Sequence, residues 1–167
     1  MSDTWVPVPA GSGFGIANLP YGVFTTPGTA PRVGVRIGDH VLDLAAALGD
    51  EVFARPSLNA FLAQGRARWS EVRARLVDLL TSEAHRPAVE PALHPLDTVR
   101  LRMPFEVADY IDFYASEHHA TNVGRIFRPD AAPLLPNWKH LPVGYHGRAG
   151  TVVVSGTGIV RPCGQRK

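Results

Sequence analysis

Residues 32–42 read Arg-Val-Gly-Val-Arg-Ile-Gly-Asp-His-Val-Leu, and this stretch has the pattern of a β-hairpin. Its first half places Val33, Val35 and Ile37 at every second position, which is the period of a strand with one buried face. Gly38-Asp39 is a two-residue linker of the kind that closes a tight hairpin. We therefore predict two antiparallel strands with an apolar face in the core.

Outward from the hairpin, the first hundred residues predict another strand, with helices inserted. Tyr21–Thr25 is a β-type run, and Asp43–Leu48 is a short helical segment ended by Gly49. Ser57 is placed to cap a second helix, which we expect to stop near Gly65. An amphipathic helix follows, with its apolar stripe at Trp69, Val72, Leu76 and Leu79 or Leu80. The predicted fold class is mainly β with inserted helices (α+β).

The composition is that of a soluble globular protein of 167 residues, 45% hydrophobic and 19% charged. Seventeen basic and fifteen acidic residues give a net charge of +2 without a Lys/Arg run, which argues against nucleic-acid binding. Neither a long apolar stretch nor the pattern of a secretory leader is visible, so we expect no membrane insertion and a cytoplasmic location. The single cysteine, Cys163, excludes an internal disulfide and a cysteine-based zinc site.

Proline recurs at regular intervals over Pro87–Pro95, which predicts a linker or a surface crossing because proline lacks an N–H and disfavours helix before it. We place a domain boundary between this segment and Pro104, giving an N-terminal domain of residues 1–103 and a second domain that begins with residues 104–167. The second segment is short for a domain that must bury its own core. We therefore expect the chain to be part of a longer protein.

Asp109–Arg128 gathers acids, tyrosines, histidines and arginines into twenty residues. Tyr110, Asp112 and Tyr114 alternate with apolar residues, as in a strand, and Ser116 suits the N-cap of a helix. One side of that helix would carry His119, Val123 and Ile126 or Phe127. A carboxylate would then lie near a histidine, which suits catalysis. Equally, such a histidine is often a core residue and such an aspartate a turn former, and spacing alone leaves both interpretations open.

A second dense segment, Leu134–Arg148, holds two prolines and two glycines, which exclude long regular structure. Aromatic and hydrogen-bonding side chains nevertheless crowd into it. Such a loop either lines a pocket or is held by Trp138 and Tyr145 as buried anchors. Beyond it, Thr151–Ser155 predicts a strand, with which Ile159–Val160 could pair.

Several motifs, taken in order, resemble the fumarylacetoacetase family, the fumarylacetoacetate hydrolases of tyrosine breakdown. They are Asn18–Phe24 (Asn-Leu-Pro-Tyr-Gly-Val-Phe), Asp109–Gly124, Leu135–Arg148, Val153–Thr157 and Arg161-Pro162. The resemblance covers essentially the whole chain and only the front portion of the family's length. It implies an SH3-like, partly open β-barrel followed by the first part of a β-rich catalytic domain, in a homodimeric enzyme. That enzyme hydrolyses a carbon–carbon bond of a small β-diketo acid, 4-fumarylacetoacetate, to fumarate and acetoacetate.

The resemblance also implies roles for five residues of this chain. The family's metal-binding aspartate falls on Asp112, its catalytic histidine on His119, and its substrate-contacting residues on Tyr114, Arg128 and Tyr145. His119 is chosen over its neighbour His118 by alignment with the family motif and not by a chemical argument. The remaining metal ligands and the acid partner of the histidine are not found in the chain.

The chemistry of these residue types agrees with the implied roles. A histidine that titrates near neutrality can activate water. A divalent cation would stabilise the oxyanion and the enolate, and carboxylate oxygens suit hard ions such as Ca²⁺ or Mg²⁺. Arginine can hold a carboxylate, and tyrosine gives directional hydrogen bonds. One carboxylate is far short of a full coordination shell, so we expect negligible hydrolysis and weak metal affinity from residues 1–167 alone.

Two other functions stay open. A superfamily relative that acts on another β-diketo acid, of the acylpyruvate type, would use the same residue types. A non-enzymatic binding or assembly module would instead present residues 1–103 as an SH3-like surface, although no peptide-binding signature stands out there.

Overall fold

The structure, a computed structural model, describes residues 4–141, 143–161 and 163–164, and their contacts define two compact units. One unit holds the residues up to Glu106 together with those from Val154 on, and the other is Val107–Val153. Pro162 of the sequence motif lies outside the described residues. The domain boundary expected after residue 103 stays a prediction.

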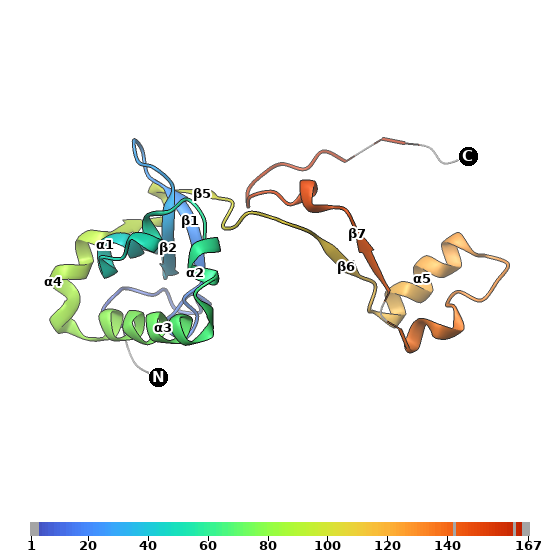
Figure 1. Ribbon diagram of the computed structural model, residues 1–167, viewed down its shortest axis with the longest axis horizontal. Coiled ribbons are helices and arrows are strands. Elements are labelled where there is room, and N and C mark those ends of the chain that lie inside the picture. Colours follow the sequence, from blue (N-terminus) through green and yellow to red (C-terminus); the bar gives the residue numbers. More distant parts are fainter. Residues whose placement is uncertain (1–3, 142, 162, 165–167) are drawn as a thin grey trace. The chain divides into compact units, whose positions relative to one another are not determined.

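The first unit is built on a five-stranded antiparallel sheet that curls into a half-barrel (Figure 1). Its strands are β1 (Tyr21–Thr25), β2 (Arg32–Ile37), β3 (His40–Asp43), β4 (Leu93–Pro95) and β5 (Arg100–Arg102), in the order β4-β3-β2-β1-β5. The predicted hairpin is confirmed, because β2 pairs with β3 and Ile37 lies opposite His40. Gly38 closes the turn with a φ of 52°, a left-handed conformation that glycine adopts without strain. The fold is mixed helix and strand, as an α+β class requires.

Helices join the strands of the first unit. They are α1 (Leu44–Leu48), α2 (Asn59–Leu62), α3 (Gly65–Thr81) and α4 (Arg86–Val89), with 3₁₀ turns at Glu51–Ala54, Glu83–His85, Glu90–Ala92 and Leu96–Thr98. Asp43 caps α1 by accepting a hydrogen bond from the Ala46 N–H at 3.2 Å, and Gly49 ends this helix as predicted, with a φ of 65°. Gly65 does not merely stop a helix. It begins α3 with a φ of 79°, because glycine allows the left-handed break between two successive helices.

The core of the first unit lies between the sheet and α3. Val33, Val35 and Ile37 of β2 are fully buried in one cluster with Leu76 and Leu80 of α3, as their spacing predicted. Burying each such side chain contributes about 1.5–3 kcal/mol. Trp69, expected in the same stripe, is instead 39% exposed; its indole N–H donates to the Phe61 carbonyl at 3.1 Å.

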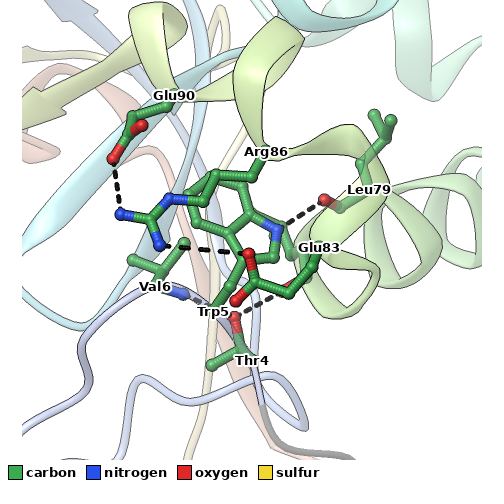
Figure 2. A network of polar contacts seen from close by, with 8 residues as sticks. Thr4, Trp5, Val6, Leu79, Glu83, Arg86 and Glu90 are labelled. Atoms are coloured by element: carbon green, nitrogen blue, oxygen red, sulfur yellow. Dashed lines mark hydrogen bonds and ion pairs between the residues drawn. The ribbon is translucent and has the colours of Figure 1, made fainter.

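The N-terminal segment is fastened to the end of α3 and to the segment that follows it (Figure 2). The indole N–H of Trp5 donates to the Leu79 carbonyl at 2.9 Å. Arg86 lies over the Trp5 ring, with its guanidinium carbon 5.7 Å from the ring centroid, and pairs with Glu90 at 3.0 Å. The hydrogen bond with Glu90 raises the pKa of Arg86. The guanidinium is in any case charged at ordinary pH, as a cation–π contact with Trp5 requires.

Of the two interpretations of Pro87–Pro95, the linker is wrong, whereas the surface crossing is confirmed, because Pro87, Pro91 and Pro95 are all exposed. Pro87 and Pro91 lie in the first turns of α4 and of the Glu90–Ala92 turn, where a missing N–H leaves no hydrogen bond unmade. Strand β4 then pairs with β3 at the edge of the sheet, a position that tolerates Pro95. Val89 is only 2% exposed, so this segment completes the first unit.

The second unit contains a two-stranded ribbon and one longer helix. Its elements are β6 (Ile111–Phe113), α5 (Glu117–Phe127), β7 (Gly144–His146), and 3₁₀ turns at Pro136–Lys139 and Ala149–Thr151. The strand expected over Thr151–Ser155 is not formed, and Ile159 and Val160 are 78% and 90% exposed. No described segment pairs with either stretch, and a strand needs a partner for its backbone groups.

No helix within the described ranges is long and apolar enough to span a membrane.

We predict that Gly34→Ala destabilises the first unit by about 1–3 kcal/mol through overpacking. A Cβ at Gly34 would lie 2.6 Å from Val41 Cγ1 and 2.8 Å from Phe24 Cε1. Urea unfolding of both variants measures the effect. Gly22→Ala is the matched control, because Gly22 pairs with Gly34 across the ladder and its Cβ would meet nothing within 4 Å. Equal midpoints for the two variants would contradict the packing argument.

We predict that Tyr21→Phe stabilises the chain by about 1 kcal/mol at neutral pH, since the Tyr21 hydroxyl is buried without a partner among the described residues. Burial raises the pKa of this phenol, an effect that Arg73 partly offsets. The stability that depends on the neutral phenol is therefore complete below the ordinary tyrosine pKa and is lost as pH rises through the folded-state pKa.

Urea unfolding from neutral to alkaline pH tests both expectations, and Tyr21→Phe should flatten the alkaline loss. Tyr110→Phe serves as the control because its ring is exposed. An unchanged alkaline slope for Tyr21→Phe would show that the loss comes from another group.

Candidate functional site

The pairing of β6 with β7 determines which candidate site residues lie on the same face of the two-stranded ribbon. The register pairs Asp112 with Tyr145 and Phe113 with Gly144. Because side chains alternate along a strand and directly paired residues share a face, Asp112, Tyr145 and Tyr114 belong to the same face of the ribbon. The strand predicted from the alternation around Asp112 is confirmed over Ile111–Phe113.

Helix α5 follows the ribbon and positions His119. Ser116 is its N-cap, as predicted, and the serine Oγ accepts a hydrogen bond from the His119 N–H at 3.4 Å. This start places the imidazole against the ring of Tyr114, with 5.7 Å between centroids and an interplanar angle of 77°. The imidazole of His118 makes no such contact within the described part of the chain.

Tyr114 connects the site. Besides His119, its ring meets Tyr145 edge-on at 6.2 Å and Trp138 edge-on at 6.5 Å. Such edge-to-face pairs contribute about 0.5–1.5 kcal/mol each beyond the area they bury. The Tyr114 hydroxyl donates to the Ala120 carbonyl at 3.0 Å, which ties the ribbon to α5. The motif resemblance marked Tyr114 as a substrate contact, but nothing in the sequence signalled that its ring would contact His119, Trp138 and Tyr145.

A hollow of about 340 Å³ opens beside Tyr114, lined by Phe113, Tyr114, Ala115, Trp138, Lys139, His140, Leu141 and Val143. The 134–148 segment therefore lines a pocket, which is one of the two interpretations of its composition. The other is wrong for Tyr145, which is 56% exposed rather than a buried anchor. Lys139 fastens the segment to α5 through an ion pair with Glu117 at 2.8 Å.

The buried side of α5 differs from the expected one. Ala120 and Gly124 are its buried residues, whereas Ile126 is 74% exposed and His119 is also exposed. Two small residues, one turn apart, let neighbouring backbone approach the helix closely, and Gly124 contacts the backbone of Pro133. The interpretation of His119 as a buried core histidine is therefore wrong.

Arg128 lies at the far end of α5. Its guanidinium donates to the Pro133 carbonyl at 2.6 Å. The rise of an α-helix places it about 13 Å from His119 along the axis. Within the described ranges, no contact joins Arg128 to Asp112, Tyr114, His119 or Tyr145.

Asp112 is the one predicted metal ligand, and its carboxylate is exposed with no ion pair or hydrogen bond among the described residues. Asp109 nearby is instead paired with His146 at 2.9 Å. An unpaired carboxylate suits a hard cation. However, no three His, Cys, Asp or Glu side chains in the described part of the chain come close enough to hold a metal. Asp112 therefore fits as one oxygen ligand and does not form a complete site.

Comparison with known proteins shows which sequences this chain is similar to. Residues 17–104 match the model of the fumarylacetoacetase N-terminal region. Fumarylacetoacetases of Bos taurus and Homo sapiens are 46% and 45% identical to this chain over 180 residues, covering 98% of it. The fumarylacetoacetase of Caenorhabditis elegans is 47% identical over 182 residues. The alignments with fumarylacetoacetases thus cover nearly the whole chain.

The chain belongs to the fumarylacetoacetase family. It spans about 43% of the length of these curated relatives.

We predict that Gly124→Ala displaces residues 128–133, since a Cβ at Gly124 would overlap the Pro133 carbonyl. Backbone chemical shifts of the 128–134 segment should move while those of β2 stay unchanged. Asn122→Ala is the matched control, because Asn122 is an exposed residue of the same helix. Equal and small shift changes in the two variants would show that the loop adapts without cost.

Proposed function

We propose that the full-length protein hydrolyses the carbon–carbon bond of 4-fumarylacetoacetate to fumarate and acetoacetate, the last step of tyrosine and phenylalanine catabolism. One observation carries this proposal. In a chain of this family, the Tyr114 ring contacts both His119 and Tyr145, and Tyr145 lies opposite Asp112. Tyr114 thus links the histidine to a second tyrosine, and the strand register links that tyrosine to the aspartate.

His119 is the proposed general base. Its imidazole takes a proton from water, and the resulting hydroxide adds to the fumaryl carbonyl carbon. The bond to the neighbouring methylene carbon then breaks, and its electron pair leaves with the acetoacetate fragment as an enolate, which takes up a proton. The edge contact with Tyr114 supports this choice, because it restrains the His119 ring while leaving it exposed to water.

Tyr114, Tyr145 and Arg128 are the proposed substrate contacts. The Tyr114 hydroxyl proton is used at Ala120, so Tyr114 offers its ring and an acceptor oxygen, whereas Tyr145 is exposed. Arg128 donates one of its five guanidinium N–H groups to the Pro133 carbonyl, so the others are available to a substrate. Its place at the far end of α5 favours contact with a terminal carboxylate of the substrate over contact with the reacting carbonyl.

Asp112 is the proposed ligand of a divalent cation, Ca²⁺ or Mg²⁺. Such an ion, when bound, stabilises negative charge on the two diketone oxygens. The unpaired, exposed carboxylate of Asp112 supports this role. Since each of these ions takes six or more oxygen ligands, the other ligands have to come from further groups, including water.

The finer architecture is also proposed. The curled five-stranded antiparallel sheet supports an SH3-like barrel for residues 1–103, and the family match ends at residue 104, where the catalytic domain would begin. We further propose a homodimeric and cytoplasmic enzyme, as the family resemblance implies.

We predict that His119→Gln in the full-length protein lowers kcat by about 10²- to 10⁴-fold, the usual contribution of a general base. Loss of diketone absorbance measures turnover. His118→Gln is the control and should leave kcat nearly unchanged, because its exposed imidazole makes no contact within the described residues. A large loss of kcat in His118→Gln, with little change in His119→Gln, would assign the role of general base to His118. Full activity in both variants would remove His119 as the general base. Absence of turnover by the unaltered full-length protein would favour a non-catalytic module, and a preference for acylpyruvates over fumarylacetoacetate would favour the related hydrolase.

We predict that Asp112→Asn weakens Ca²⁺ or Mg²⁺ binding at least about tenfold, because a neutral amide replaces a charged oxygen ligand. Calorimetric titration of the full-length protein with each ion gives the affinity independently of turnover. Asp130→Asn is the control, since Asp130 is exposed and outside the ribbon. Unchanged affinity in Asp112→Asn would remove this residue from the metal site.

A further inference from the structure

A second hollow, of about 350 Å³, lies in the first unit between the β1–β2 turn and strand β5. It is lined by Thr25, Thr26, Pro27, Gly28, Thr29, Thr98, Arg100 and Arg102. The volume falls at the lower end of the range for small-molecule sites, about 300–1,000 Å³. Two of the lining residues are cationic and none is acidic.

The sheet register places the two arginines side by side. Arg100 pairs with Thr25, Leu101 with Phe24, and Arg102 with Val23. Because side chains alternate along a strand, Arg100 and Arg102 share one face of β5, about 7 Å apart along the strand. Strand β5 is at the edge of the sheet, so no further strand in the described part of the chain lies beyond it.

Neither Arg100 nor Arg102 forms an ion pair or a side-chain hydrogen bond within the described residues. By contrast, Arg32, Arg68 and Arg86 each have a carboxylate partner. Each guanidinium offers five N–H donors, and two like charges beside a hollow without an acidic group concentrate positive potential there.

The walls of the hollow are held in place by internal hydrogen bonds. The Thr29 hydroxyl accepts from the Thr26 N–H at 3.0 Å, and Gly28 has a φ of 77°, which only glycine adopts readily in a turn. The Thr98 hydroxyl donates to the Pro95 carbonyl at 2.7 Å. The hydroxyls of Thr29 and Thr98 are thus engaged with backbone groups of their own turns, and the two arginines supply the charged donors of the hollow.

We propose that this hollow binds a small oxyanion, the carboxylate or phosphate group of a metabolite, held by Arg100 and Arg102. Guanidinium groups bind planar carboxylates and tetrahedral phosphates through paired N–H donors, and two of them can bind one anion from both sides. The site goes beyond the proposed hydrolysis, because none of its residues belongs to the cluster around Tyr114.

The test is a nuclear magnetic resonance titration of the full chain at low ionic strength, with inorganic phosphate in one series and succinate in another. We expect saturable shifts of the Gly28, Thr29, Arg100 and Arg102 amides, with an affinity that falls several-fold as sodium chloride is added, because salt screens exposed charges. Shifts with phosphate alone identify a phosphate ligand, and shifts with succinate alone identify a carboxylate ligand. Shifts with both show a general oxyanion site.

The variant R100Q/R102Q should bind at least about tenfold more weakly, because it removes both charged donors. Unchanged amide shifts of Val33 and Val35 will show that its sheet is intact, and Arg55→Gln, an exposed arginine outside the hollow, should bind as the unaltered chain does. Absence of saturable shifts with either anion would overturn the proposal, as would undiminished binding by R100Q/R102Q.

Discussion

Backbone hydrogen bonds between β2 and β3 pair Gly34 with Asp43 and Ile37 with His40, and this register decides which side chains face α3. A slip of one residue would turn the whole apolar set of β2 out of the core. The same register brings Asp43 beside Arg32, with 2.9 Å between its Oδ2 and the arginine Nε. Asp43 is only 4% exposed and also caps α1, so one buried carboxylate joins the hairpin to the first helix.

The features that sequence predicts well are those that local chemistry determines. The hairpin turn, the Asp43–Gly49 boundaries of α1 and the Ser116 cap each depend on a few adjacent residues. The linker interpretation of the proline segment fails for the opposite reason: β4 becomes a strand by pairing with β3, some fifty residues earlier in the chain. No local pattern reports that partner. The strand expected at Thr151–Ser155 fails likewise, because no described segment pairs with it.

In the candidate site, too, some predictions are confirmed and others are not. Motif resemblance selected Asp112, Tyr114, His119 and Tyr145, and the ribbon and α5 bring these four together. Arg128 does not join them within the described residues. The apolar periodicity of α5 predicted the wrong buried side for this helix. Small residues at Ala120 and Gly124 mark close approach of neighbouring backbone, and apolar periodicity does not detect such contacts.

The pairing of β1 with β5 has a consequence for how the chain folds as it is made. The Thr25 hydroxyl and the Arg100 carbonyl meet across 75 positions of sequence. During synthesis from the N-terminus, the outer edge of β1 therefore stays unpaired until Arg100–Arg102 leave the ribosome. An open strand edge can pair with another chain, and long-range closure is slow. The half-barrel is thus most exposed to misassembly just before its last strand arrives.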